Sequence, residues 1–365
     1  MGTPGRVWAE VDLGAIRHNV RVLRRRSRAP RLMAVVKADG YGHGAVPVAR
    51  AALAGGADSL AVATAGEGAE LRRAGIEAPI LVFGDLMPEG LGLAARERLA
   101  VSAHSVPSAR RIAASSRKLE VHLKVDTGMN RWGLEPGEVG AALKALGRPP
   151  DGIYTHLACA DSDPEVTRRQ LGVFDSVLAA HPFGGALVHA ANSAATLWHP
   201  SAHYGCVRPG IALYGLHPAG DSGDPGEEGL RPALALKSYV AAVRQLEAGE
   251  GVSYGLVFRA PGPMLAATVP VGYADGYRRA LSGKAEALVR GRRRPLLGRV
   301  AMDACVFGVD GEVRVGDEVV LLGGQGEEAV RAEELAARAG TINYEITTGL
   351  NPRRVERSYA DVQGS

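Results

Sequence analysis

A lysine stands where an apolar run meets a glycine-rich turn, in the sequence AVVKADGYGHG at residues 34–44. Burying an ammonium group at the end of a strand costs several kcal/mol unless the group has a partner. Lys37 can avoid this cost through a lowered pKa or a Schiff base to a carbonyl cofactor, and it can also snorkel to solvent. Polar residues elsewhere in the chain decide between these roles.

The segments around this lysine alternate between strand-like and helical patterns. After a strand-like stretch at 8–12, helical spacing covers 13–25, with Asp12 as the expected N-cap. Apolar strand-like runs then recur at 32–36, 59–63, 80–83, 100–103, 121–125, 152–156, 187–190 and 207–213. Helical segments such as 107–115 and 164–180 separate them. Eight such units within roughly 200 residues predict βαβ connections and a closed (β/α)8 barrel.

The pattern changes beyond a polar, glycine-rich linker at 219–226. Helical spacing is confined there to 331–339. Strand-like runs cover 234–243, 264–271, 287–289, 304–309 and 318–322. We therefore predict an α/β protein with a TIM-like (β/α)8 barrel at 12–230, followed by a mostly-β domain at 231–365 that the strand at 1–11 joins.

Composition is that of an ordinary globular protein, with 46% apolar and 22% charged residues among 365. A net charge of +4 is too small to indicate a nucleic-acid or membrane partner. The basic runs at 24–28 and 290–294 lack aromatic neighbours and predict a helix end or a hairpin. Cys159, Cys206 and Cys305 have neither disulfide nor zinc spacing, so we expect no metal. The sequence shows neither the apolar core of a signal peptide nor the run of ~20 apolar residues that a membrane span needs, so we expect a cytoplasmic protein.

Polar residues follow several predicted barrel strands, which is where barrel enzymes carry functional groups. Besides Lys37, they are Lys124, Asp126, Arg131, His156, Asn192, Ser193 and Arg208; in the eighth unit the turn Gly210-Ile211 adds backbone N–H donors. Taken singly, His156 is typical of a core histidine, Arg208 of an ion pair and Ser193 of a helix N-cap. Together, a phosphate-binding helix N-terminus opposite a lysine indicates pyridoxal 5′-phosphate, with Arg208 facing its pyridine nitrogen.

The turn after Lys37 also satisfies a dinucleotide-binding fingerprint. GYGHGA at 40–45 fits G-x-G-x-x-A, and Asp58 stands at a suitable distance further on. Such short matches are weak evidence for a Rossmann unit. The number of strand-like runs, and the lysine before the turn, favour the barrel.

These motifs resemble those of alanine racemases. The similarity begins with the lysine stretch and continues through DTGMNR at 126–131, Thr155-His156, HAANS at 189–193 and the segment 207–215. It extends through VSYG at 252–255, VGYADG at 271–276, Met302-Asp303 and INYE at 342–345. The resemblance implies a homodimer in which the β domain of one subunit completes the other's barrel mouth. It also implies interconversion of L- and D-alanine with pyridoxal phosphate, supplying D-alanine for peptidoglycan.

The resemblance assigns roles to individual residues. Lys37 is implied to hold the cofactor and act as one base, and Tyr254 from the partner subunit to act as the other. Cofactor contacts are implied for Tyr41, His156, Ser193, Arg208, Gly210, Ile211 and Tyr344. Substrate-carboxylate contacts are implied for Arg131 and the Met302 backbone, and entrance positions for Tyr273 and Tyr344. Lys124 matches a lysine whose carbamate steadies the arginine in some members, and Ala301 stands where relatives often have cysteine.

Other functions share parts of this pattern. A racemase of serine or of a broader amino-acid range would use the same groups. A barrel-type decarboxylase of basic amino acids needs no second base, so Tyr254 argues against it. A pyridoxal-phosphate carrier without turnover would lack the β domain, whereas this chain continues for about 130 residues beyond the linker. The resemblance also implies that His156 hydrogen-bonds between Tyr254 and Arg208 and favours the tyrosinate.

Overall fold

The structure is a computed structural model that describes residues 5–115 and 118–361. The described chain divides into two compact units. The barrel unit comprises Ile16–Leu213 and Glu228–Leu230, and the β unit comprises Met1–Ala15, Tyr214–Glu227 and Arg231–Ser365. No helix in the described ranges is long and apolar enough to cross a membrane.

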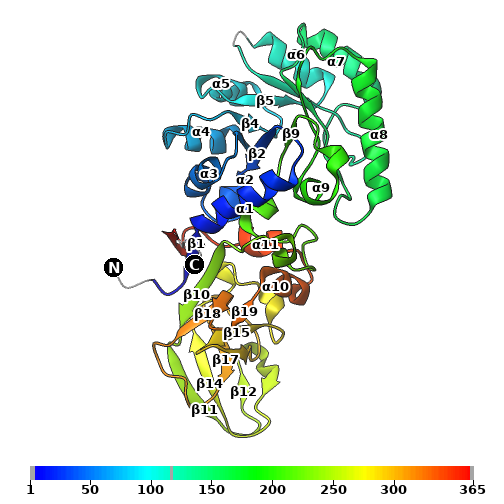
Figure 1. The fold of residues 1–365 in the computed structure, drawn as a ribbon. Coiled ribbons are helices and arrows are strands. Elements are labelled where there is room, and N and C mark those ends of the chain that lie inside the picture. Colours follow the sequence, from blue (N-terminus) through cyan, green and yellow to red (C-terminus); the bar gives the residue numbers. More distant parts are fainter. Residues whose placement is uncertain (1–4, 116–117, 362–365) are drawn as a thin grey trace. The chain divides into compact units, whose positions relative to one another are not determined.

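A closed barrel of parallel strands forms the core of the barrel unit (Figure 1). In pairing order, its described strands are β2 (Arg31–Val35), β3 (Ser59–Val62), β4 (Ile80–Val82), β5 (Ala100–Ala103), β6 (Val121–Lys124), β7 (Gly152–Tyr154), β8 (Leu187–His189) and β9 (Cys206–Val207). β2 pairs with β9 through Leu32 and Val207, which closes the ring. The predicted barrel is confirmed, and the dinucleotide interpretation is wrong because it needs an open sheet.

Helices cover the outside of these strands (Figure 1). They are α3 (Ala45–Ala54), α4 (Ala65–Arg73), α5 (Pro88–Arg96), α6 (Val106–Ala114), α7 (Val139–Leu146), α8 (Pro164–Ala180) and α9 (Ser193–Trp198). Helix α1 (Leu13–Arg26) begins as predicted, since Asp12 Oδ1 accepts hydrogen bonds from the N–H groups of Gly14 and Ala15. Its last turn carries the first basic run, as expected.

The eighth barrel strand is shorter than the apolar run at 207–213 predicts. β9 ends at Val207, and a 3-10 helix, η3 (Ile211–Tyr214), follows it. Pro209 has no N–H to donate to a neighbouring strand, and Gly210 adds backbone freedom, so the strand stops before both. The prediction of a strand through Leu213 is wrong, and the residues after β9 form a turn at the barrel mouth.

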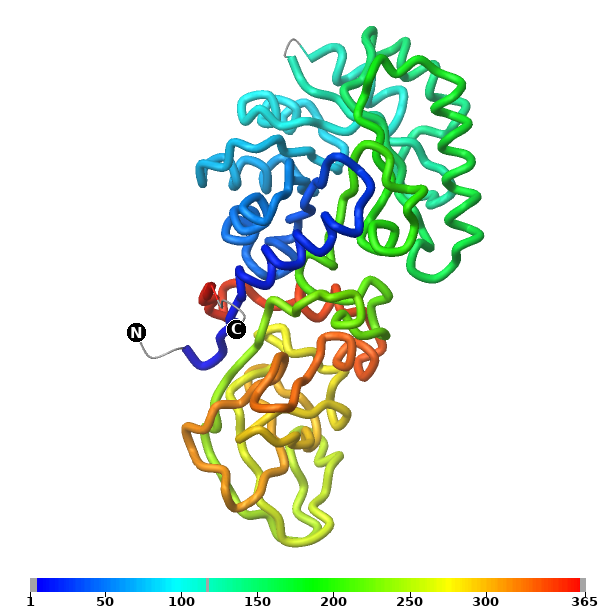
Figure 2. The backbone as a smooth tube through the Cα atoms, viewed as in Figure 1, coloured from blue at the N-terminus to red at the C-terminus, as the bar shows by residue number. Residues whose placement is uncertain are grey.

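The β unit is built around a sheet with the order β16-β15-β18-β10-β1-β20, to which β19 adds. A second described sheet has the order β11-β14-β17, and β12 pairs with β13. The strands are β1 (Trp8–Asp12), β10 (Leu234–Tyr239), β11 (Ala242–Leu246), β12 (Gly251–Val252), β13 (Phe258–Arg259), β14 (Met264–Val269), β15 (Glu286–Val289), β16 (Arg292–Pro295), β17 (Cys305–Val309), β18 (Glu318–Gln325), β19 (Glu328–Val330) and β20 (Glu356–Ala360). Figure 2 shows the first and last strands side by side, and they pair in parallel.

Two predictions for this unit are wrong. The run at 234–243 is not one strand but β10 and β11, which lie in different sheets. Helix is not confined to 331–339, because α11 (Asn343–Thr348) follows α10 (Ala332–Ala339). A helix of six residues is too short to show a helical repeat of apolar residues.

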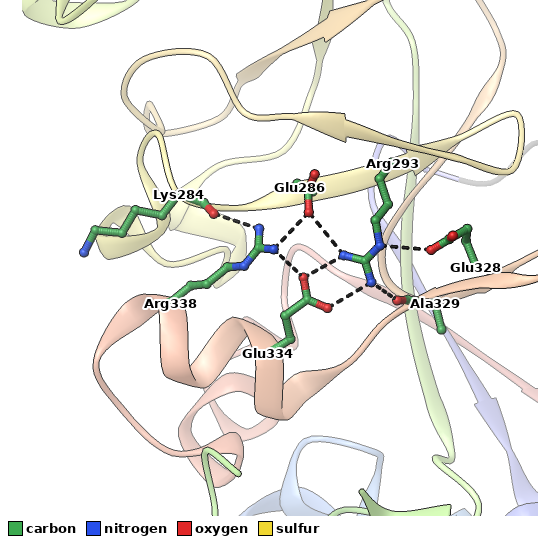
Figure 3. Close-up of polar contacts among 7 residues, drawn as sticks. All are labelled: Lys284, Glu286, Arg293, Glu328, Ala329, Glu334 and Arg338. Atoms are coloured by element: carbon green, nitrogen blue, oxygen red, sulfur yellow. Dashed lines mark hydrogen bonds and ion pairs between the residues drawn. The ribbon is translucent and has the colours of Figure 1, made fainter. Parts of the chain in front are cut away.

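Paired charges fasten α10 to the main sheet (Figure 3). Arg293 on β16 forms ion pairs with Glu286 on β15, Glu328 on β19 and Glu334 on α10. Arg338, also on α10, pairs with Glu286 and Glu334. The second basic run therefore lies in a hairpin, as predicted, and its arginines serve the fold.

Candidate functional site

Lys37 opens the short helical segment α2 (Lys37–Tyr41), just beyond the end of β2. Residues 38–41 all have φ between 52° and 59°, in the left-handed region. Such backbone costs about 1–3 kcal/mol for each non-glycine residue and persists only where other groups hold it. One such group is Glu67 on α4, whose Oε1 accepts a 2.8 Å hydrogen bond from Ala38 N–H. Lys37 therefore lies at the start of a strained turn, and a side chain from the next β/α repeat of the barrel holds that turn in place.

Cationic side chains gather around Lys37 at the barrel mouth. Burial lowers the pKa of the Lys37 ammonium, and Arg131 lowers it further. Lys124, which is 5% exposed, has its pKa lowered to about 8 by burial, then by Arg131 and Arg208. Burial and the same cations hold the pKa of His156 well below its usual value, so the imidazole is neutral. This concentration of positive charge suits an anionic ligand.

Arg208 is buried and its described hydrogen bonds go to neutral acceptors. It donates to Thr155 O at 2.8 Å, to Ala190 O at 3.0 Å and to His189 Nδ1 at 2.9 Å. Since an arginine can only donate, His189 Nδ1 accepts and its Nε2 carries the proton. That proton is donated to His122 Nδ1, 2.8 Å away. The chain of bonds therefore fixes the tautomers of both histidines.

Burial accounts for the charge states of the residues in this hydrogen-bonded series. The Arg208 guanidinium lies 5.2 Å from the centre of the Tyr154 ring. Burial lowers the pKa of Arg208 to about 10. It lowers the pKa of His122 to about 4 and that of His189 well below its usual value, so both stay neutral. None of the described hydrogen bonds joins Arg208 to His156, and the His156 bridge stays a prediction.

The turn after β9 meets the start of α9 in a small polar cradle. The interpretation of Ser193 as a helix N-cap is wrong, because the Asn192 side chain caps α9. The Ser193 hydroxyl oxygen instead accepts hydrogen bonds from Gly210 N–H at 2.8 Å and Ala212 N–H at 3.2 Å. A Cβ at Gly210 would lie 2.4 Å from the Tyr41 hydroxyl, so Tyr41 reaches this turn too. Two hydroxyl groups and a glycine turn thus converge.

The loop after β6 carries Arg131 on an ordered frame. The Asp126 carboxylate accepts hydrogen bonds of 2.8–3.1 Å from backbone N–H groups at 128–131. Burial opposes ionisation of Asp126, but these four donors outweigh it and lower the carboxyl pKa. Arg131 and Trp132 line an open cavity of about 510 Å³ in this loop. The loop therefore presents an arginine at a cavity of ligand size.

Lys124 lies near the Trp132 ring, which in turn neighbours the His104 ring. The Lys124 Nζ lies 5.9 Å from the centre of the Trp132 ring, and the His104 ring lies 5.4 Å from that of Trp132. Burial, then Lys124, lowers the pKa of His104 to about 4. Sequence reasoning missed His104, although it directly follows β5, and the strand-end rule would have found it.

The predicted residues of the β unit are exposed on that unit. Tyr254, Met302 and Tyr273 are 71%, 55% and 42% exposed. Tyr273 N–H donates to Ala301 O at 3.0 Å, which ties the segments of Tyr273 and Met302 together.

The backbone before Tyr254 is strained and anchored. Ser253 has φ 61° and ψ −171°, a region that favours glycine, and its hydroxyl donates to Arg299 O at 2.7 Å. Tyr344 lies on α11, and its hydroxyl donates to Pro218 O at 3.4 Å. Sequence reasoning assigned no role to Ser253, His122 or His189, because their hydrogen-bond partners lie far along the chain, where no local pattern reveals them.

Comparison with known proteins places this geometry in a family. The family description "Alanine racemase, N-terminal domain" matches residues 11–218, and "Alanine racemase, C-terminal domain" matches residues 233–359. The chain belongs to the alanine racemase family. A relative, "Alanine racemase" from Symbiobacterium thermophilum, is 50% identical over 366 residues, or 96% of each chain. "Alanine racemase 1" from Bacillus subtilis is 41% identical, covering 95% of this chain and 91% of that one.

Solved structures of the family share the fold. The alanine racemase of E. faecalis superposes with a TM-score of 0.91 at 37% identity, covering 98% of both chains. That of Bacillus anthracis with bound L-Ala-P gives 0.90 at 38% identity, covering 99% of this chain and 96% of that one. The predicted resemblance, the barrel followed by a mostly-β domain and the racemase class of enzyme are confirmed.

Proposed function

We propose that this protein interconverts L-alanine and D-alanine, with pyridoxal 5′-phosphate as its cofactor. The observation that carries the proposal is the cluster of Lys37, Lys124, Arg131 and Arg208 at the strand ends. None of the four forms a salt bridge with any residue in the described parts of the chain. A cofactor phosphate and a substrate carboxylate would supply the missing negative charge.

The chain offers groups that fit this cofactor. Tyr41, Ser193, Gly210 and Ile211 would hold the phosphate in the cradle where hydroxyl groups meet the glycine turn. Tyr344 would join them, and Arg208 would donate to the pyridine nitrogen. Lys37 would hold the aldehyde, which its lowered pKa favours by exposing the neutral amine. The bound cofactor supplies an electron-withdrawing ring that stabilises negative charge on the substrate Cα.

Inversion of the stereocentre needs one proton-transfer group on each face of Cα. Lys37 would serve one face and Tyr254 from a second copy of the chain the other, with His156 favouring the tyrosinate. Arg131 and the Met302 backbone would bind the substrate carboxylate, while Tyr273 would line the entrance. The 71% exposure of Tyr254 supports this, because the side chain is free to reach another subunit.

The proposal extends to the whole molecule. The barrel at 12–230 would bind the cofactor, and the β domain at 231–365 with residues 1–11 would complete the site of the second subunit in a homodimer. The exposed Tyr254, Tyr273 and Met302 support that surface. We place the enzyme in the cytoplasm, where its D-alanine would serve peptidoglycan synthesis.

We also propose that Lys124 carries a carbamate. A pKa near 8 leaves part of the amine neutral at physiological pH. Its nitrogen would attack CO₂, forming an N–C bond and releasing a proton to solvent. The resulting anion would steady Arg131, which lies close enough to lower the Lys124 pKa. Native mass spectrometry should show the added CO₂ on Lys124, and an unmodified lysine under bicarbonate would refute the modification.

The activity is tested by incubating the holoenzyme with L-alanine and coupling product to a D-amino-acid oxidase. We expect a signal that Lys37→Ala abolishes. A signal with L-serine but not with L-alanine would show that serine, and not alanine, is the substrate. No signal with any amino acid in the presence of cofactor would refute racemase activity.

Exchange of the Cα proton in D₂O tests the second base. In Tyr254→Phe, one enantiomer should still exchange through Lys37 without inversion, whereas exchange of the other should be lost. Equal loss for both enantiomers would contradict two bases on opposite faces.

A further inference from the structure

Glu67 completes a capping box at the start of α4. Its N–H donates to the Thr64 hydroxyl at 3.2 Å, and its Oε2 accepts from Thr64 N–H at 3.0 Å. The same oxygen accepts a 2.7 Å bond from Ala63 N–H. A helix start of the S/T-x-x-E type needs only this oxygen of the carboxylate.

The other oxygen leaves the helix and reaches the lysine turn. Glu67 Oε1 accepts from Ala38 N–H at 2.8 Å, and Ala38 is the first of the left-handed residues after Lys37. No cap of α4 requires this bond. The carboxylate therefore joins the end of β3 to the strained turn that follows β2.

Glu67 also acts on Lys37 through its charge. Burial and Arg131 disfavour the Lys37 ammonium, whereas Glu67 favours it. The charged or titratable groups coupled to this amine are Glu67 on α4, Arg131 in the loop after β6, Lys124 on β6 and His156 after β7. Glu67 is the carboxylate among them.

We propose that Glu67 is a positioning residue for Lys37, which holds the left-handed turn and directs the lysine amine into the barrel mouth. The proposal rests on the proposed role of Lys37 as the cofactor lysine. It distinguishes the two oxygens of one carboxylate: Oε2 caps a helix, and Oε1 fixes the turn that carries the reactive residue.

The test measures adduct formation at Lys37 in the apoenzyme. Pyridoxal 5′-phosphate is added to the protein at a series of pH values. The Lys37 amine condenses with the aldehyde with loss of water. Borohydride then reduces the resulting C=N bond. Mass spectrometry of the peptide gives the rate at each pH. Glu67→Gln is compared with Thr64→Ala, which removes the other half of the capping box and leaves the bond to Ala38 in place. Thermal melting verifies that both variants fold.

We expect Glu67→Gln to reduce the limiting rate about tenfold to a hundredfold, as displacement of a reacting group does. Its pH midpoint should fall, because a carboxylate that favours the ammonium is gone. Thr64→Ala should keep the wild-type midpoint and rate. Equal behaviour of Glu67→Gln and Thr64→Ala, or a wild-type profile in Glu67→Gln, would overturn the proposal. Absence of any adduct at Lys37 in the wild-type protein would instead refute the cofactor assignment.

Discussion

Replacing Lys124 with methionine should stabilise the apoenzyme near neutral pH. The Lys124 side chain is 5% exposed, and its pKa is lowered from 10.5 to about 8 by burial, then by Arg131 and Arg208. Each unit of pKa shift corresponds to about 1.4 kcal/mol, so holding the ammonium in the folded barrel costs about 3 kcal/mol. Methionine fills similar volume without charge and removes this cost.

The pH dependence follows from proton counting. Between pH 8 and 10.5 the unfolded chain holds the Lys124 proton and the folded chain has released it, so stability rises with pH in this window. Below pH 8 both states hold the proton and the full cost applies. Denaturation in CO₂-free buffer should therefore show a stability difference between Lys124→Met and wild type that is largest below pH 8 and vanishes above 10.5. A difference independent of pH would refute the reasoning.

Trp132 provides a local reading of the same titration. Its ring centre lies 5.9 Å from Lys124 Nζ, so its fluorescence should respond to the ammonium charge with a midpoint near pH 8. Trp132→Phe keeps Trp8 and Trp198 and serves as the control that identifies the signal. A midpoint near the ordinary lysine value, or one that persists in Lys124→Met, would show that Lys124 is not perturbed as described.

Three further substitutions test other contacts. Arg208→Glu should raise the fraction of substrate that is lost to transamination. A carboxylate at this position would favour a protonated pyridine nitrogen and so prolong the negative charge on Cα. An unchanged yield of pyruvate would contradict this expectation. Gly210→Ala places a Cβ 2.4 Å from the Tyr41 hydroxyl and should weaken cofactor binding about tenfold, or about 1.4 kcal/mol, in titrations of the apoenzyme; wild-type affinity would argue against the cradle. Gly152→Ala places a Cβ 2.2 Å from the His122 ring and should cost about 1–3 kcal/mol, seen as a lower melting temperature; an unchanged melting curve would refute the tight fit.

The barrel was predictable because its strands are short apolar runs separated by helices with a clear repeat. The strand at 100–103 and the helix at 164–180 have the predicted bounds. The errors occur where local patterns mislead. The apolar run after Val207 contains Pro209 and Gly210, whose backbone effects outweigh its hydrophobicity. The short α11 leaves no repeat to detect.

The candidate site residues were also visible in the sequence, since lysine, arginine and histidine are conspicuous at the ends of apolar strands. Their charge states were not. The neutral form of His156 and the lowered pKa of Lys124 arise from burial and from cations contributed by other strands. A linear pattern shows that Lys37, Lys124 and Arg208 follow different strands, but only ring closure between β2 and β9 brings those strands to one mouth.

Two side chains that fix the backbone beside candidate site residues share a reason for escaping sequence analysis. Glu67 and Ser253 both form hydrogen bonds with main-chain atoms, which every residue possesses. A main-chain partner leaves no residue type to recognise, so a motif search finds the candidate reactive side chain and misses the one that we propose positions it. Strained turns increase this dependence, because a left-handed segment at 38–41 persists only while its supports remain. Positioning in this fold is thus encoded in backbone geometry, while chemistry is encoded in side-chain identity.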